Sequence, residues 1–345
     1  MAFSQLPGCS VRAICSSVPH RIFDNLTETT AFDPAEVDKV VKMAGVRTRH
    51  VVSDNICSTD LCIAAAKRVL ENLSWPPDSV DALIFVTQSP DYFLPSSCCL
   101  AHRALGLSDQ CAALDVGLGC SGYPYAMWLA TMMLNGGGAK RVLLLHGETP
   151  SRFANKSDRA VALLFGDAGS ATALERSSDS SAPPWAFALH TDGTGWRDLI
   201  VEGGGFRDRT PTDASKLFVA MNGANIFNFT IKRIPSLVEE TLRCSNTAPE
   251  AVDYFILHQS NLFIMKYLAK KMKVPESKLP LTIQHFGSTG GPSIPLTITQ
   301  GQLIRPADKS LRLLLVGYGV GLSWGSALID LAPDAILDHI ILPAE

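Results

Sequence analysis

The sequence predicts a layered α/β fold built from two related halves. Strand-like apolar runs alternate with helical patterns, and 46% hydrophobic against 18% charged residues among 345 gives a large buried core. Several stretches also recur later in the chain in the same order, as an internal duplication produces. We expect halves spanning residues 1–175 and 176–345 that bury their sheet faces against each other.

Four pairs of segments carry this repeat. They are Thr59–Leu73 with Phe227–Leu242, Val80–Ser89 with Val252–Ser260, Arg141–Leu145 with Arg312–Val316, and Gly169–Ala171 with Gly325–Ala327. The period is too long for a solenoid. The alternative is a chance similarity, because Val, Leu and Ile runs are common in buried strands.

Local patterns give the individual elements. Thr59–Leu73 is an amphipathic helix because its apolar residues recur on one face, and Pro76-Pro77 ends it. The Ser/Pro-rich connector Ser177–Pro184 is typical of an exposed loop. The expected strands are Leu6–Val18, Val80–Thr87, Cys111–Val116, Arg141–His146 and Gly169–Leu174, and the other expected helices are Asp33–Met43, Pro95–Leu105, Tyr123–Leu134 and Leu262–Met272.

Charge, cysteine content and hydropathy exclude several classes of protein. A net charge of −3 gives no reason to expect nucleic acid or a membrane surface as a partner. The nine cysteines are an odd number without a CxxC metal pattern, which indicates a reducing compartment. The chain starts without a signal-peptide pattern, and no apolar run reaches the ~20 residues that span a bilayer. We expect a soluble, cytoplasmic protein.

The stretch Asp115-Val-Gly-Leu-Gly-Cys120-Ser-Gly-Tyr123 is the leading candidate for chemistry. An apolar run enters it and a helical pattern leaves it, so the thiol lies on a sharp turn at a helix N-terminus. The helix dipole favours a thiolate there, and the three glycines supply the permissive backbone that the turn needs. The alternative is that Cys120 is a small buried hydrophobic residue, as most free cysteines are.

Three stretches of the second half are further candidates. His258 follows a strand, where the functional groups of α/β sheets gather, although a lone histidine is more often structural. Phe286–Pro295 is rich in small residues, and we expect a loop there rather than a core element. Gly317–Gly325 either points backbone N–H groups at a developing oxyanion or is a tight turn between two buried strands.

Cofactor and metal motifs give no match. Gly203-Gly-Gly205 lacks the Lys-Ser/Thr of a P-loop, and no G-x-G-x-x-G opens an early βαβ unit. The spacing of His146, Glu148, His190 and His285 fits no metal site. We expect neither a metal nor a bound cofactor.

Together these stretches resemble the β-ketoacyl-acyl-carrier-protein synthase III family of the thiolase superfamily, over essentially the whole chain. The motifs are Asp115–Gly122, His258–Asn261, Gly287–Pro295 and Gly319–Gly325, with supporting ones at Gly45–His50, Asp158-Arg159, Phe165–Gly169 and Met221–Phe227. The resemblance implies the superfamily's thiolase-like five-layered αβαβα fold and a homodimer. It also implies acyl thioester substrates carried by coenzyme A or acyl carrier protein.

The resemblance assigns catalytic positions. The cysteine matching Cys120 takes an acyl group from a thioester, and the histidine matching His258 helps a second substrate to attack it, which divides one hard transfer into two easier ones. The N–H of Cys120 and one from the turn Gly319-Val320-Gly321 would hold the oxyanion. The family's third catalytic residue is the Asn of Gly-Asn-Thr, and here that position is Ser288.

Ser288 can give one hydrogen bond but reaches less far than Asn, so stabilisation of the enolate left by malonyl decarboxylation is in question. Either Ser288 still serves a carbon–carbon condensation of specialised lipid or polyketide metabolism, which is our first hypothesis, or the acyl group goes to an oxygen, a nitrogen or a pre-formed β-keto nucleophile. A non-catalytic partner subunit of a condensing enzyme is a further alternative, against which the intact Cys120 and His258 argue.

The resemblance also implies where the acyl donor binds. Arg159 matches a phosphate-contacting arginine, Asn261 matches a pantetheine contact, and Phe227 is assigned to the same substrate-binding set. Leu94 takes the place of a residue that enters the partner's acyl pocket and gates chain length. Small apolar acyl groups are therefore the default substrates.

The carrier of the donor stays open between coenzyme A and acyl carrier protein. Lys270 and Lys271 match basic positions at which the family docks its carrier protein. Lys39 and Met43 stand where coenzyme A-dependent relatives hold adenine between a Trp and an Arg.

Overall fold

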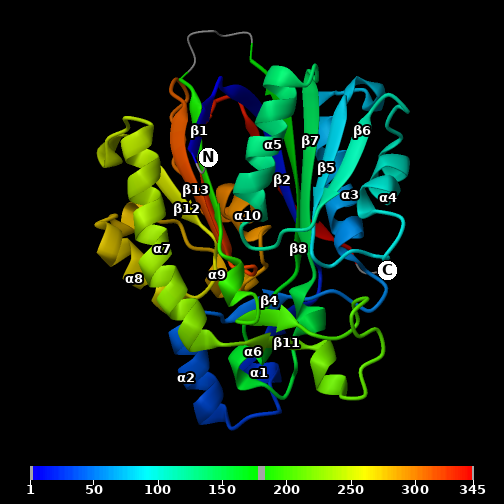
Figure 1. Ribbon diagram of the computed structural model, residues 1–345, viewed down its shortest axis with the longest axis vertical. Helices are drawn as coiled ribbons and strands as arrows, with labels where there is room; N and C mark the ends of the chain where they lie inside the picture. Colours follow the sequence, from blue (N-terminus) through cyan, green and yellow to red (C-terminus); the bar gives the residue numbers. More distant parts are fainter. Residues whose placement is uncertain (1–2, 178–182, 344–345) are drawn as a thin grey trace.

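The computed structural model describes residues 3–177 and 183–343, and two large sheets dominate it (Figure 1). The first contains, in spatial order, β15 (Ile336–Leu342), β2 (Cys9–Pro19), β8 (Ala168–Arg176), β7 (Arg141–Glu148), β5 (Ala82–Val86) and β6 (Ala112–Val116). The second contains β1 (Phe3–Leu6), β9 (Trp185–Thr191), β14 (Ser323–Leu331), β13 (Leu311–Gly319) and β12 (Tyr254–Leu257).

Helices cover both outer faces and fill the space between the sheets, which makes an αβαβα stack. The helices α3 (Ser58–Leu73) and α4 (Ser97–Leu105) pack on the first sheet, and α7 (Gly223–Cys244) and α8 (Leu262–Met272) pack on the second. The helices α5 (Gly122–Gly136) and α10 (Ser293–Gln300) contact strands of both sheets. The five-layered α/β architecture that the sequence predicts is confirmed.

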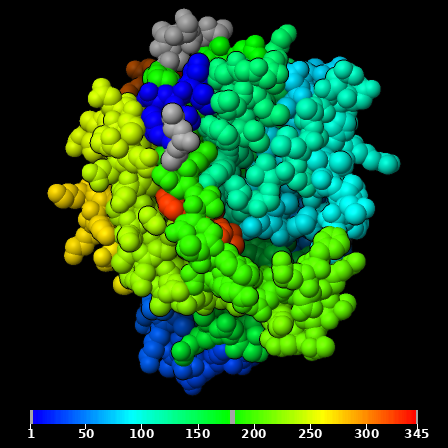
Figure 2. Space-filling model, viewed as in Figure 1, coloured from blue at the N-terminus to red at the C-terminus, as the bar shows by residue number. Residues whose placement is uncertain are grey.

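Short elements gather at one end of the stack, at the bottom of Figure 1. They are α1 (Asn25–Glu28), α2 (Pro34–Ala44), α6 (Arg159–Ala162), α9 (Ile283–Phe286) and two small sheets, β3 (Ile22–Asp24) with β4 (Thr48–His50) and β10 (Leu199–Val201) with β11 (Val219–Met221). In the same view, Figure 2 shows a recess where the yellow-green surface near residues 200–220 meets the cyan surface near residues 90–110.

The two large sheets repeat one arrangement. The run β5–β7–β8–β2 has the same order and the same relative strand directions as β12–β13–β14–β9. The internal repeat in the sequence matches β5 with β12, β7 with β13 and β8 with β14, and these strands occupy equivalent places in the two runs. The chain ends cross over, because β1 joins the second sheet beside β9 and β15 joins the first beside β2. The halves 1–175 and 176–345 therefore exchange one edge strand each.

The structure differs from the expected elements at a few places. Leu6–Val18 is two strands, because Pro7 and Gly8 separate β1 from β2. Ser293–Pro295 is not a loop but the first turn of α10, buried between the sheets, where small residues allow close packing. The sequence analysis missed β9 and β15, and the expected loop Ser177–Pro184 falls mostly on residues outside the described ranges. No helix in the described ranges is long and apolar enough to cross a membrane.

Candidate active site

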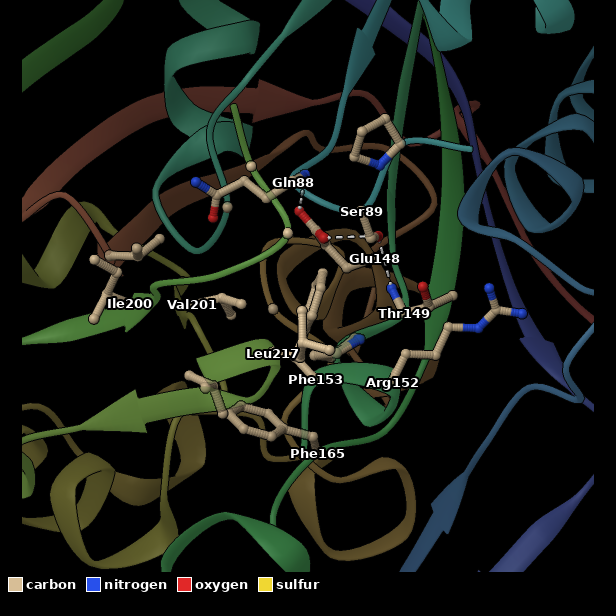
Figure 3. Close-up of a pocket in the computed structure, with 18 of the residues that line it drawn as sticks. Gln88, Ser89, Glu148, Thr149, Arg152, Phe153, Phe165, Ile200, Val201 and Leu217 are labelled. Carbon is tan, nitrogen blue, oxygen red and sulfur yellow. Dashed lines mark hydrogen bonds between the residues drawn. The ribbon is translucent and has the colours of Figure 1, made fainter. Parts of the chain in front are cut away.

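A cavity of about 810 Å³ opens beside the ends of β6, β7 and β13, and Cys120 forms part of its wall. One side is apolar and includes Leu199–Val201 and Leu217, whereas the other carries Ser89 and Glu148 (Figure 3). A thiol therefore faces a space of the size that ligand pockets have.

Cys120 lies on a tight turn between β6 and α5. The Gly122 N–H closes the turn on the Gly119 carbonyl at 2.8 Å. A Cβ at Gly119 would lie 2.3 Å from the Oε1 atom of Gln88, so a side chain there would have to displace the Gln88 amide. The strand, turn and helix predicted around the thiol are confirmed.

The surroundings of the thiol favour its protonated form. Burial first and the charge of Glu148 second raise the pKa of the Cys120 thiol to about 12, although the N–H groups of Val320 and Cys120 bond to the sulfur and oppose the rise. Desolvation opposes the stabilisation of the thiolate that a helix N-terminus provides. The two N–H donors are the N–H of Cys120 and one from the turn Gly319-Val320-Gly321, the positions that the family resemblance implies for oxyanion donors.

His258 directly follows β12, and its ring is held by two partners. Its Nδ1 atom lies 2.8 Å from the Ser293 hydroxyl at the start of α10, and the Gly290 carbonyl accepts a hydrogen bond from the ring. The residue is only 3% exposed, and this burial lowers the pKa of His258 to about 4. The imidazole is neutral at physiological pH and can accept or donate a proton.

The end of β13 contacts both the thiol and the histidine. A Cβ at Gly319 would lie 3.0 Å from the Cys120 sulfur, and one at Gly317 would lie 2.7 Å from the Cys120 carbonyl oxygen. At the edge of β13 that pairs with β12, the His258 N–H donates to the Val316 carbonyl at 2.8 Å. Glycine lets this strand approach the thiol so closely because it has no side chain. One strand end therefore brings both predicted groups to the same place.

Ser288 lies behind the cavity wall. It forms a parallel bridge with Phe165, its N–H donates to the Leu164 carbonyl at 2.9 Å, and the residue is 3% exposed. Its hydroxyl has no hydrogen-bond partner within residues 3–177 and 183–343, so its donor is free for another group.

Comparison with known proteins decides the family. The family model of 3-oxoacyl-[acyl-carrier-protein] synthase III matches residues 114–193. A second model, of the C-terminal part of the same family, matches residues 242–331. A β-ketoacyl-[acyl-carrier-protein] synthase III of Xanthomonas axonopodis pv. citri is 31% identical over 318 residues, which cover 91% of this chain and 95% of the relative. The chain belongs to the synthase III family.

Solved structures agree with this assignment. A 3-oxoacyl-(acyl-carrier protein) synthase from Burkholderia xenovorans LB400 has 40% identity and a TM-score of 0.94, with 99% of each chain covered. A synthase III from Aquifex aeolicus VF5 has 25% identity and a TM-score of 0.80, covering 93% of this chain and 99% of its own. The protein is a thiolase-like condensing enzyme and acyltransferase of the synthase III kind, as its motifs indicate.

The residues assigned to donor binding lie outside the cavity of this synthase III-like enzyme. Arg159 opens α6 and pairs with Glu36 of α2 at 2.8 Å. Asn261 caps α8 by accepting the N–H of Phe263 at 2.9 Å, and Phe227 stacks on Phe263 with 6.0 Å between the ring centres. Because α2 contacts α8, the three assigned residues share one face of the molecule.

The remaining assigned residues are at the surface. Lys270 and Lys271 are exposed in the last turn of α8, where the Lys271 ammonium donates to the Ile231 carbonyl at 2.7 Å. Leu94 is 78% exposed, whereas Phe93 beside it lines the cavity. Leu94 thus does not line the cavity of its own chain.

The sequence analysis weighed Glu148 and His146 only as metal ligands and missed their place in the site. Both lie at the buried end of β7, and Glu148 lines the cavity. The His146 ring fills the space that Gly122 and Gly291 leave open. No metal-binding cluster occurs among the described residues, and the available signal was instead two polar residues ending a buried strand.

We expect alkylation of Cys120 by iodoacetamide to accelerate about tenfold per pH unit between about pH 7 and about pH 10, because the raised pKa leaves a small thiolate fraction that grows with pH. Peptide mass spectrometry separates Cys120 from the other cysteines, and the exposed Cys99 serves as the internal reference. A rate that levels off below about pH 9 would contradict the account of this thiol.

Proposed function

We propose that Cys120 takes an acyl group from an acyl thioester and that the acyl-enzyme then condenses with a second substrate, with His258 assisting, to form a carbon–carbon bond. The observation that carries the proposal is the shared strand end, which contacts a thiol with two N–H donors and a neutral imidazole and lies beside the cavity. In the first step the sulfur–acyl bond of the donor is exchanged for one to Cys120, and the thiol proton leaves with the donor's sulfur.

The N–H groups of Cys120 and Val320 would stabilise the oxyanion of the tetrahedral intermediate. They already reach the sulfur in the resting protein, which supports their placement. Gly319 and Gly321 flank Val320 and keep the turn free of side chains beside the thiol. Fixed donors of this kind need no reorganisation during the reaction, and losing one typically costs ~10²–10³ in rate.

The donor's carrier, coenzyme A or acyl carrier protein, would bind at the face that holds Arg159, Asn261 and Phe227. The exposed Lys270 and Lys271 on the same helix as Asn261 suit the negative charge that both carriers present. Assays with acyl-coenzyme A and with acyl carrier protein as separate donors distinguish the two.

Acylation is tested by mass spectrometry after incubation with acyl thioesters. We expect an acyl adduct on the peptide of Cys120, no adduct there in Cys120→Ala, and an unchanged adduct in the control Cys244→Ala. His258→Ala should keep the adduct but slow its transfer to the second substrate by about 10²-fold or more, because the proton carrier is lost. No adduct with any donor would overturn the proposal and favour a non-catalytic partner subunit.

A test at Ser288 distinguishes condensation with a malonyl thioester from transfer of the acyl group to another nucleophile. With labelled malonyl thioester we expect the protein to release carbon dioxide together with a β-keto product. Ser288→Asn should raise that release about tenfold because its amide reaches further toward the thioester oxygen, while the exposed control Ser215→Asn should not. Release by Ser288→Asn alone would show that the natural enzyme transfers its acyl group to an oxygen, a nitrogen or a β-keto nucleophile instead.

A second copy of this chain is the partner that the surface beside the cavity suits. Among the described residues, the edge strand β6 has no partner on one side and exposes Ala112 and Ala113, and the apolar Tyr92, Phe93 and Leu94 are also exposed. Unpaired apolar edges are usually covered.

We propose a homodimer closed through this edge, which would also place Leu94 against the partner. Sedimentation analysis should give twice the 37.1 kDa of the chain, and Leu94→Glu should weaken the dimer because it buries an unpaired charge. A monomer at every concentration would contradict this.

A further inference from the structure

We propose that a second cavity, separate from the one that holds Cys120, binds an organic anion. Its carboxylate or phosphate group would lie against the guanidinium of Arg49, and its apolar body would lie against the phenylalanines of the cavity wall. None of the residues assigned above to the acyl donor, the acyl chain or the carrier lines this cavity. The inference does not depend on the proposed acylation of Cys120.

The second cavity has a volume of about 860 Å³ and lies among the short elements at the end of the stack, at the bottom of Figure 1. Its walls come from residues 28–32 at the end of α1, from residues 51–54 after β4, and from residues 151–156 before α6. Arg152 is the one described residue that lines both cavities. The two cavities are therefore neighbours with different walls.

Arg49 places a buried positive charge in this wall. It is only 6% exposed, its Nε atom donates to the Asn25 side-chain oxygen at 2.9 Å, and its Nη1 atom donates to the Phe165 carbonyl at 2.7 Å. Within residues 3–177 and 183–343, its Nη2 atom has no hydrogen-bond partner and its guanidinium forms no ion pair. A buried cation is stabilised by a counter-ion and by acceptors for its N–H groups, and an anionic ligand supplies both.

The acids near Arg49 are held by other groups. Glu28 pairs with Arg21 and accepts the Asp24 N–H at 2.8 Å. Asp167 accepts the N–H groups of Val52 at 2.8 Å and of Ser151 at 3.0 Å.

Burial lowers the pKa of Arg49 to about 10, although the charges of Asp167 and Glu28 oppose the change. The guanidinium is therefore charged at physiological pH. The remaining acid of the wall, Asp54, is exposed to solvent.

Further donors face the same cavity. The hydroxyl oxygen of Thr29 is buried and has no hydrogen-bond partner among the described residues. The ammonium group of Lys156 lines the cavity and pairs with no acid that the structure describes. Arg152 adds a third positive charge, because its guanidinium bonds only to carbonyl groups of the Ser53–Ile56 segment, at 2.6 to 3.1 Å, and to the Cys57 sulfur. Positive charge therefore exceeds negative charge along this wall.

The rest of the wall is apolar and requires a ligand with an apolar body. It includes Phe23, Phe32, Val51, Leu163 and Phe218, and the Arg49 guanidinium lies over the Phe23 ring at 4.8 Å. Pockets that combine apolar walls with a few placed polar groups are typical of organic ligands. The fork of a guanidinium fits carboxylate and phosphate equally, so both head groups share the chemistry of this site.

Isothermal titration calorimetry with octanoate, octyl phosphate and octan-1-ol tests the inference, because these probes share an apolar chain and differ in the head group. We expect both anions to bind at least about tenfold more tightly than the alcohol, since hydrogen bonds between charged groups are the strong ones. Inorganic phosphate should bind more weakly than octyl phosphate, because it leaves the apolar wall in water. The anion that binds more tightly identifies the head group.

Variants locate the binding. Arg49→Gln should remove the preference for the anions. Because it also removes two structural hydrogen bonds, Lys156→Glu decides if that variant does not fold. Lys156→Glu should weaken the anions about fivefold and leave the alcohol unchanged. The matched control Lys67→Glu reverses an exposed charge on α3 that lines neither cavity, and it should behave as the natural protein.

A further variant separates the two cavities. Val201→Phe fills part of the cavity of Cys120 only, so it should leave anion binding unchanged. Loss of binding in Val201→Phe would assign the probe to that other cavity and overturn the inference. Equal affinity for the anions and the alcohol, no binding of either anion, or unchanged binding in Lys156→Glu would overturn it too. The adduct on Cys120 is measured separately, so failure here leaves the proposed function standing.

Discussion

The close approach of the glycine end of β13 to Cys120 is the contact on which the rest of the site depends. Side chains at Gly317 and Gly319 would collide with the backbone and the sulfur of that residue. The approach brings the Val320 N–H to the thiol, and the edge of β13 that pairs with β12 holds His258 through its backbone. Because β6 and β13 belong to different sheets, the site exists only when the two halves are packed together.

Burial gives the site its electrostatic character. Desolvation raises the pKa of Cys120 and Glu148 and lowers that of His258, so all three groups are neutral in the resting protein. A neutral site admits an acyl chain without an unpaired charge beside it.

Much of the fold followed from local patterns. The turn of Cys120, the helix α8 and the internal repeat each depend on nearby residues and on apolar periodicity, and all three are present. The exchange of β1 and β15 between the sheets could not be predicted, because the pairing of an edge strand depends on tertiary contacts with residues far away in the sequence. The helical start of α10 was missed because it also depends on tertiary packing. Ser293–Pro295 is buried between the two sheets, and its small residues and prolines do not by themselves indicate a helix.

The site was predicted less completely than the fold. Motifs identified Cys120, His258 and Ser288, but the protonation of the thiol depends on how deeply it is buried, which a helix-dipole argument does not contain. Glu148 was missed as a residue of the cavity because the Gln88 N–H and the Ser89 hydroxyl, which bond to its carboxyl group, come from a segment far away in the sequence.

The most direct test of the central claim is a crystal structure of the protein acylated on Cys120. The account predicts an acyl chain inside the cavity, with its carbonyl oxygen within hydrogen-bond distance of the N–H groups of Cys120 and Val320. A chain that leaves the cavity, or a carbonyl oxygen that meets neither N–H group, would contradict it.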